Sequence, residues 1–229
     1  MVFDFQKLQQ GNGWGGMGHV QLVLIPILIL YATCMNVEAV KDDVMARYVL
    51  HNTDWVSLGT IAVDDSIKGY PFVNMKSHVD GPKDGSNGNI YLYLTDLDIA
   101  SRNMKVNDKV SVMATMAGTD YCKSKNYNAQ DPRCPKVTIT GKVVRLEKSD
   151  PEYKMAKESL FTKYPVMATW PPNHFFFVAK IVPEEVRVMH ELTGMVKVDM
   201  KDYLNASPND FQDDASKLSE AAKNGANFN

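Results

Sequence analysis

Two segments in the middle of the chain decide the fold: "KVSVMATMAG" at residues 109–118 and "PKVTITGKVVRL" at residues 135–146. Apolar and polar side chains alternate in both, with Val110 and Val112 flanking Ser111 in the first segment. Strict alternation is typical of a β-strand that buries one of its faces. The two segments therefore predict strands of a sheet whose inner face covers a hydrophobic core.

Further strand-like and helix-like segments lie on both sides of this pair. The additional strand-like segments are residues 56–63, 71–79, 90–95, 174–183 and 184–191. Helices are predicted at residues 37–52, with Val40, Val44 and Tyr48 along one side, and at residues 96–105 and 149–165. Six or seven strands with short turns and few helices favour a closed barrel or a sandwich, because an open sheet of this size would expose its edges.

The last of these helices has recognisable ends. Ser149 or Asp150 can cap its first turn, Pro151 suits the first helical position, and Pro165 ends the helix. The sequence as a whole predicts a β-rich α+β domain.

An apolar segment near the N-terminus resembles the core of a secretory leader. "LVLIPILILYATC", which ends at Cys34, carries no charge and is shorter than the roughly 20 apolar residues of a membrane span. We predict a signal peptide over residues 1–39, with cleavage after Cys34 or Ala39 and with Met17 as an alternative start. An uncleaved signal anchor and a buried helix are the alternatives, and Pro26 argues against the buried helix.

The cysteines and one sequon are consistent with secretion. Removal of the leader leaves Cys122 and Cys134, separated by a polar segment that a disulfide would hold in place by about 3 kcal/mol. Two separate thiols are the alternative, and we expect no metal site because no C-x-x-C partner lies nearby. Asn205 begins the sequon Asn-Ala-Ser. Together these features predict a lumenal or extracellular glycoprotein.

Composition and missing motifs limit the function further. The 229 residues include 25 basic and 27 acidic side chains, interspersed, with a net charge of -2, so we expect no nucleic-acid binding. The sequence contains no G-x-S-x-G elbow, no H-E-x-x-H and no phosphate-binding glycine motif, and no pair of histidines has metal-ligand spacing. We predict one domain over residues 40–204, followed by a polar, disordered tail over residues 205–229.

Seven motifs over residues 46–207 carry a resemblance to a known family. They are "ARYVLHNTDWVSLGTIAV", "GYPFVNMKSHVDG", "IYLYLTDLDIASRN", "YCKSKNYNAQDPRC", "VTITGKVV", "AKESLFTKYPVMATWPPNHFFFVAKI" and "DYLNAS". In order and spacing the chain resembles CREG, the secreted cellular repressor family, a branch of the FMN-binding split-barrel superfamily. The resemblance implies a six-stranded split barrel with about three flanking helices, a homodimer, glycosylation, and passage through the secretory and endolysosomal route. The segment after Met189 matches the family poorly.

The resemblance also raises the question of a flavin. In related enzymes of the pyridoxamine-phosphate oxidase type, the region matching residues 89–103 lines the FMN phosphate site. The possible phosphate donors here are Lys76, Thr95, Ser101 and Arg102. Asp96 and Asp98 bring negative charge into the same turn, and a like charge near a phosphate costs on the order of 1 to 4 kcal/mol. We therefore expect no cofactor, with Tyr91 and Tyr93 as bulky side chains that fill the pocket.

The sequence accordingly predicts a protein that acts by binding, with no catalytic residues. The loops at residues 80–89 and 119–134 are the candidate recognition surfaces. By resemblance, its role lies in growth restraint and differentiation, through a cell-surface or mannose-6-phosphate receptor, without stable membrane insertion. An FMN-dependent oxidoreductase is the main alternative, and a small-molecule carrier barrel is a third.

Overall fold

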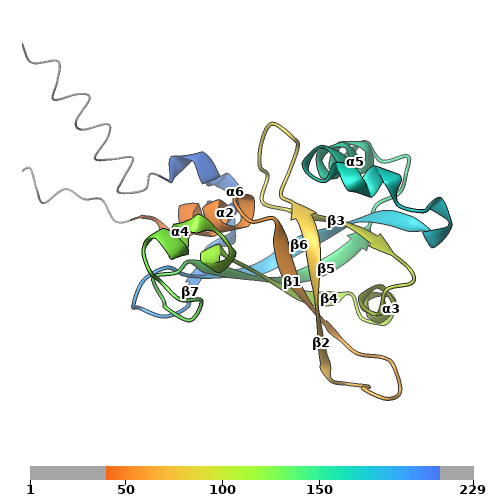
Figure 1. Ribbon diagram of the computed structural model, residues 1–229, viewed down its shortest axis with the longest axis horizontal. Coiled ribbons are helices and arrows are strands. Elements are labelled where there is room, and N and C mark those ends of the chain that lie inside the picture. The colour runs from red at the N-terminus through yellow and green to blue at the C-terminus, as the bar shows by residue number, and fades with distance from the viewer. Residues whose placement is uncertain (1–39, 212–229) are drawn as a thin grey trace, which may run out of the picture. The chain divides into compact units, whose positions relative to one another are not determined.

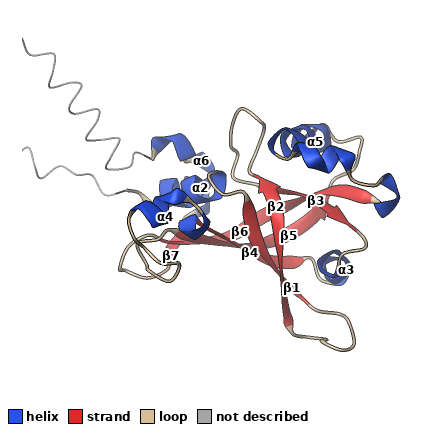
Figure 2. Ribbon diagram, viewed as in Figure 1, coloured by secondary structure: helices blue, strands red, loops and turns tan. Residues whose placement is uncertain are grey.

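A closed ring of six antiparallel strands forms the centre of the computed structural model, which describes residues 40–211 (Figures 1 and 2). The strands are β1 (Trp55–Ile61), β2 (Pro71–Val79), β3 (Ile90–Thr95), β4 (Lys109–Thr115), β5 (Lys136–Arg145) and β6 (Phe176–Met189). They are paired in the order β3-β2-β1-β4-β5-β6, and pairing of β3 with β6 closes the ring. A short strand, β7 (Val196–Val198), pairs with β6 outside the ring. The predicted six-stranded barrel is confirmed.

The alternating pattern of β4 and β5 sets the inner and outer faces of the barrel. The two strands are antiparallel, with Val112 opposite Ile139 in the register. Both residues are buried in the main core, while Ser111 between the valines is exposed. The period of two in the sequence therefore identified the buried face correctly.

Strand β6 differs from the prediction. Residues 174–183 and 184–191 were expected to form two strands, but they form one strand of 14 residues. Pro183 lies within it, opposite Gly141, where the register with β5 shifts at a bulge. A Cβ atom on Gly141 would lie 2.1 Å from the Val182 carbonyl oxygen. Proline is tolerated inside a strand at such a bulge because the regular ladder is already interrupted.

Five α-helices lie around the barrel in the described part of the chain, compared with about three predicted. They are α2 (Asp42–His51), α3 (Ile99–Val106), α4 (Asp120–Ser124), α5 (Pro151–Lys163) and α6 (Met200–Asn205). The sequence did not reveal α4 and α6, which are too short to show a helical period. Figure 1 shows α2, α4 and α6 gathered at one end of the barrel and α5 beside β2 and β3.

Helix α2 buries a different face from the one predicted. Met45, Ala46, Val49 and Leu50 are the apolar residues that enter the main core. Tyr48 of the predicted stripe is only partly buried. The helix also buries Arg47, which is 1% exposed.

Helix α5 begins and ends as predicted. The side chain of Asp150 accepts a hydrogen bond from the Glu152 backbone N–H at 2.8 Å, and Pro151 is the first helical residue. The helix covers a second, smaller core on the outside of the barrel, which contains Tyr91 and Leu160.

The packed domain continues past the predicted boundary at residue 204. Pro208 is buried, and the Phe211 ring lies 4.1 Å from the Tyr48 ring of α2, centroid to centroid. Residues 205–211, assigned to the tail, therefore pack on the domain. The predicted signal peptide and the rest of the predicted tail lie outside the described residues. Between residues 40 and 211, no helix has both the length and the apolar character needed to cross a membrane.

Candidate functional site

Lys76, the first possible phosphate donor, is paired with an acid. Asp98 begins α3, and its Oδ1 accepts a hydrogen bond from the Ala100 backbone N–H at 3.0 Å. Its Oδ2 forms an ion pair with Lys76 Nζ, and the two side chains are only 14% and 15% exposed. Because the carboxylate already compensates the ammonium charge, Lys76 has little net attraction for a phosphate.

The neighbouring donors and cations are also engaged. Thr95 Oγ1 donates a hydrogen bond to the His174 carbonyl oxygen. Asp96 pairs with Lys105 at 3.0 Å and with Arg145 at 3.4 Å. The hydrogen bond from Lys105 is the main cause of the lowered pKa of Asp96, so this carboxyl stays ionised beside Thr95. Lys76, Lys105 and Arg145 are therefore each already engaged by Asp96 or Asp98 in an ion pair.

Ser101 and Arg102, although adjacent in sequence, lie on different sides of α3. Ser101 is 2% exposed, and its Oγ has no hydrogen-bond partner among the described residues. Arg102 is exposed. The pKa of Asp64 is lowered mainly by hydrogen bonds from Ser66, and the Arg102 charge acts in the same direction. The four predicted donors thus do not form one cluster of available groups, and they do not fit a doubly charged flavin phosphate.

The two predicted pocket-filling tyrosines lie on the outer face of β3. The Tyr91 hydroxyl donates to Glu152 Oε1 at 2.7 Å, and burial raises the pKa of Tyr91 to about 12. The ring of Tyr93 is stacked on Phe176 at 4.9 Å and meets the edge of Phe161 at 5.2 Å. Both tyrosines therefore fill space between the barrel and the elements that cover it.

The glycine loop, residues 80–89, is held by a buried polar network that the sequence did not reveal. Arg47 donates from one terminal nitrogen to Ser86 Oγ at 2.7 Å and from the other to the Tyr203 carbonyl oxygen at 2.9 Å. Ser86 in turn donates to Asp80, and the Tyr203 hydroxyl donates to the Gly88 carbonyl oxygen at 2.8 Å. The network therefore connects α2, the glycine loop and α6.

Gly88 is required where this network is most crowded. Its φ is +79°, in the left-handed region that favours glycine. A Cβ atom there would lie 3.1 Å from both the Arg47 guanidinium and the Tyr203 ring. Asp80, Asn87 and Gly88 close the turn, since the Asp80 carbonyl oxygen accepts the N–H groups of the other two residues at 2.8 and 3.2 Å. The loop thus turns the chain between β2 and β3 and presents residues 82–85 to solvent.

Asp80 is the ionised centre of this network. His51 Nδ1 lies 3.0 Å from Asp80 Oδ1, and the Asp80 side chain is 8% exposed. Burial by itself raises the pKa of Asp80, but the hydrogen bonds from His51 and Ser86 outweigh it and hold the pKa below its usual value. Asp80 therefore balances the buried Arg47 charge through the Ser86 hydroxyl.

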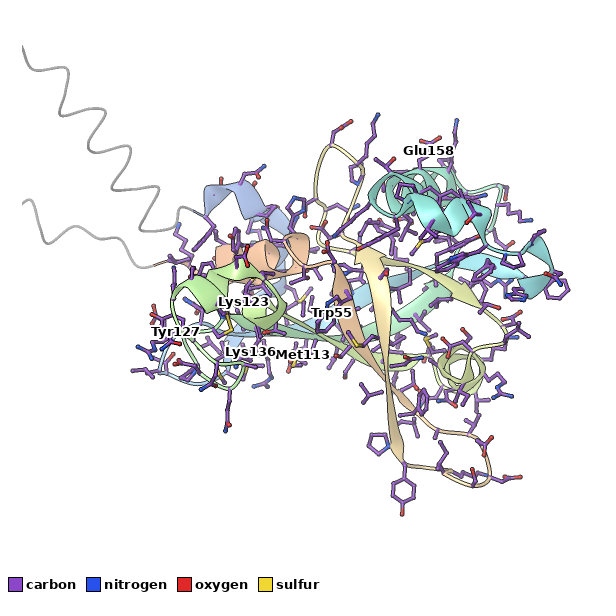
Figure 3. The ribbon with its side chains drawn as sticks, viewed as in Figure 1. Trp55, Met113, Lys123, Tyr127, Lys136 and Glu158 are labelled. Atoms are coloured by element: carbon purple, nitrogen blue, oxygen red, sulfur yellow. A yellow bond between two sulfur atoms is a disulfide. The ribbon has the colours of Figure 1, made fainter. Side chains whose placement is uncertain are left out.

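The second predicted recognition loop, residues 119–134, contains the predicted disulfide. Cys122 and Cys134 are bonded, with 5.4 Å between their Cα atoms, and both are buried. Lys136 Nζ donates to the Ala129 carbonyl oxygen at 2.8 Å, which holds the loop against β5. Figure 3 shows Lys123, Tyr127 and Lys136 together at the end of the barrel where α4 lies, while Glu158 lies on α5, at the other end.

No group of metal ligands is found among the described residues, and two of the buried or partly buried histidines bind structural partners. Over residues 40–211, no three His, Cys, Asp or Glu side chains are placed to hold a metal ion. His78 is buried and donates from Nε2 to the Leu50 carbonyl oxygen at 2.9 Å, and His190 lies 2.8 Å from Asp42. Each of these histidines has a structural partner.

Comparisons with known proteins agree with this geometry. Residues 39–205 match the family described as "CREG, beta-barrel". Protein CREG1 of Gallus gallus is 37% identical over 166 residues, covering 72% of this chain and 85% of that protein. Protein CREG1 of Homo sapiens is 32% identical over 163 residues, covering 71% and 73%.

Solved structures share the fold at lower identity. A heme-binding protein from Mycobacterium smegmatis superposes with a TM-score of 0.60 at 18% identity, covering 75% of this chain and 63% of that one, under two thirds of its length. This likeness concerns the fold alone. The family match spans most of the chain, and both CREG1 proteins exceed 30% identity. The chain therefore belongs to the CREG family.

Proposed function

We propose that this CREG-type protein is a secreted or endolysosomal glycoprotein that binds other proteins in growth restraint and differentiation, and that it is not an enzyme. The observation that carries this proposal is the ion pair between Lys76 and Asp98 at the start of α3. This ion pair engages Lys76, one of the four possible phosphate donors, and Arg102 is exposed instead of completing a site.

Two features support the proposed secreted or endolysosomal location. Disulfides persist in oxidising environments, and the buried Cys122–Cys134 bond closes a loop with little regular structure of its own. Asn205 is exposed at the end of α6, where an oligosaccharyltransferase can reach its sequon. The proposed signal peptide over residues 1–39 supplies the route into that compartment.

The outer face of the barrel supports a homodimer. Met75 on β2 and Met113 on β4 both lie opposite Ser57 on β1, so the three side chains form a row across neighbouring strands. Met75 is 55% exposed, Met113 39% and Val73 63%. A row of exposed, uncharged side chains of this kind suits a second copy of the chain. The dimer then displays both recognition loops, residues 80–89 and 119–134, to a cell-surface or mannose-6-phosphate receptor.

An absorbance spectrum combined with the intact mass of secreted material tests the proposal. We expect a colourless protein whose mass shows loss of the leader, one disulfide and a glycan on Asn205. Stoichiometric flavin absorbance that disappears in Arg102→Ala would instead establish the FMN-dependent oxidoreductase. The same spectrum would reveal heme, which the structural neighbour from Mycobacterium smegmatis is described as binding.

A further inference from the structure

A polar groove lies between the glycine loop and the segment that follows α6. Its volume is about 450 Å³, and its walls include Arg47, Ser86, Leu204, Asn205 and Pro208. We propose that this groove holds the first N-acetylglucosamine of a glycan attached to Asn205, so that the sugar bridges the glycine loop and α6. This inference rests on the proposed glycosylation of Asn205, and it assigns a binding site on the protein to the first sugar of that glycan.

The charged side chains around the groove have partners of opposite charge, which favours an uncharged polar occupant. Lys83 lies 3.9 Å from Asp84, and His51 lies 3.0 Å from Asp80. Arg47 is 1% exposed and is balanced by Asp80 through Ser86, so its charge is not available to a free anion. Ser207 and Asn209 also line the groove, and their polar side chains are suitable hydrogen-bond partners for the hydroxyl and acetamido groups of a sugar.

The other walls match the remaining surface of a sugar. Ser86 and the glycine-loop backbone present polar groups, while Leu204, which is 50% exposed, presents apolar surface. A pyranose ring has hydroxyl groups at its rim and C–H groups on its faces, so it can use both kinds of wall. The volume also falls within the roughly 300–1,000 Å³ that is typical of small-ligand sites.

The attachment point explains why the sugar enters this groove. Asn205 is itself part of the wall, so a sugar on its side-chain nitrogen begins at the mouth of the groove. Covalent attachment keeps the local concentration of the ligand high, and weak contacts are then sufficient to order it. Once seated, the sugar adds a connection beside the one that Arg47 makes between Ser86 and the Tyr203 carbonyl.

Hydrogen exchange of the full secreted protein, read by mass spectrometry over residues 80–90, tests this inference. Three glycoforms are compared: untreated protein, protein trimmed to a single N-acetylglucosamine by an endoglycosidase, and protein stripped by an amidase that converts Asn205 to Asp. Asn205→Gln removes the sugar without creating a charge. Ser207→Thr is the matched control, because it keeps both the sequon and a hydroxyl at the Ser207 capping position.

We expect the untreated, trimmed and Ser207→Thr forms to exchange equally slowly in the loop, and the stripped and Asn205→Gln forms to exchange about fivefold faster. Two results would overturn the proposal that the groove binds the sugar. One is a trimmed form that exchanges as fast as the stripped form, and the other is equal exchange in the forms that carry sugar and the forms that lack it. A secreted protein whose intact mass shows no sugar on Asn205 would overturn the proposed glycosylation as well, which separates the two failures.

Discussion

Replacing Arg47 with Met tests whether the buried network holds the domain together. Methionine keeps an unbranched stem in the same space but removes the guanidinium, which makes hydrogen bonds of 2.9 Å to the Tyr203 carbonyl and 2.7 Å to Ser86. Hydrogen bonds from a charged group contribute about 1.5–3 kcal/mol each, so the gross loss is about 3–6 kcal/mol. Relief of the burial of the charge offsets part of this loss, which leaves a net destabilisation of about 3 kcal/mol.

For a domain of this size, such a loss lowers the midpoint of thermal unfolding by about 6–12 °C. Differential scanning calorimetry of the secreted protein measures the shift. Arg187→Met is the matched control, since Arg187 is exposed and pairs with Glu185 on its own strand, a contact worth less than about 1 kcal/mol. An Arg47→Met midpoint within about 2 °C of the parent protein would refute the stabilising role of the network.

Three further outcomes follow from the structure. Replacing Cys122 and Cys134 with Ser opens a ring with a sequence separation of 12, and urea unfolding should show a loss of about 3 kcal/mol; an unchanged midpoint contradicts this. Burial lowers the pKa of His78 from 6.5 to about 4, so as the pH falls the imidazole is protonated in the unfolded chain before it is protonated in the folded one. The free energy of unfolding is therefore unaffected by His78 above pH 6.5, and it falls by up to about 3 kcal/mol as the pH drops to about 4. His78→Gln should flatten that decline in urea midpoints, and an equal decline in both proteins would argue against it. Met75→Glu should convert the proposed dimer to a monomer in sedimentation velocity. The control Phe175→Glu should remain a dimer, because Phe175 is 68% exposed but lies outside the proposed dimer face. The same oligomeric state in both variants would contradict the proposed face.

The barrel could be predicted because the signal for each strand is local. Alternation in β4 and β5 identifies the buried face without knowledge of the partner strand. The extent of β6 could not be predicted in the same way, because Pro183 reads as a break unless its position opposite Gly141 is known. Helix α6 has only six residues and depends on the side chain of Asp199, which accepts hydrogen bonds from two backbone N–H groups.

The site was less predictable than the fold, because its residues acquire their roles from distant partners. Asp98 was predicted to bring negative charge into the turn, yet only the structure shows that it pairs with Lys76. Arg47 gave no signal at all, since a basic residue in an amphipathic helix is usually exposed. Its burial depends on Ser86 and Tyr203, which belong to segments far along the chain.

The contact between Arg47 and Tyr203 spans 156 positions, nearly the whole described domain. During synthesis, the ribosome therefore produces the helix that carries the arginine long before the residue that completes its environment. Until then the guanidinium stays hydrated, and the turn that it anchors stays open. Contacts of such high sequence separation form slowly, so we expect the nascent chain to expose this end of the barrel to chaperones until α6 has left the exit tunnel.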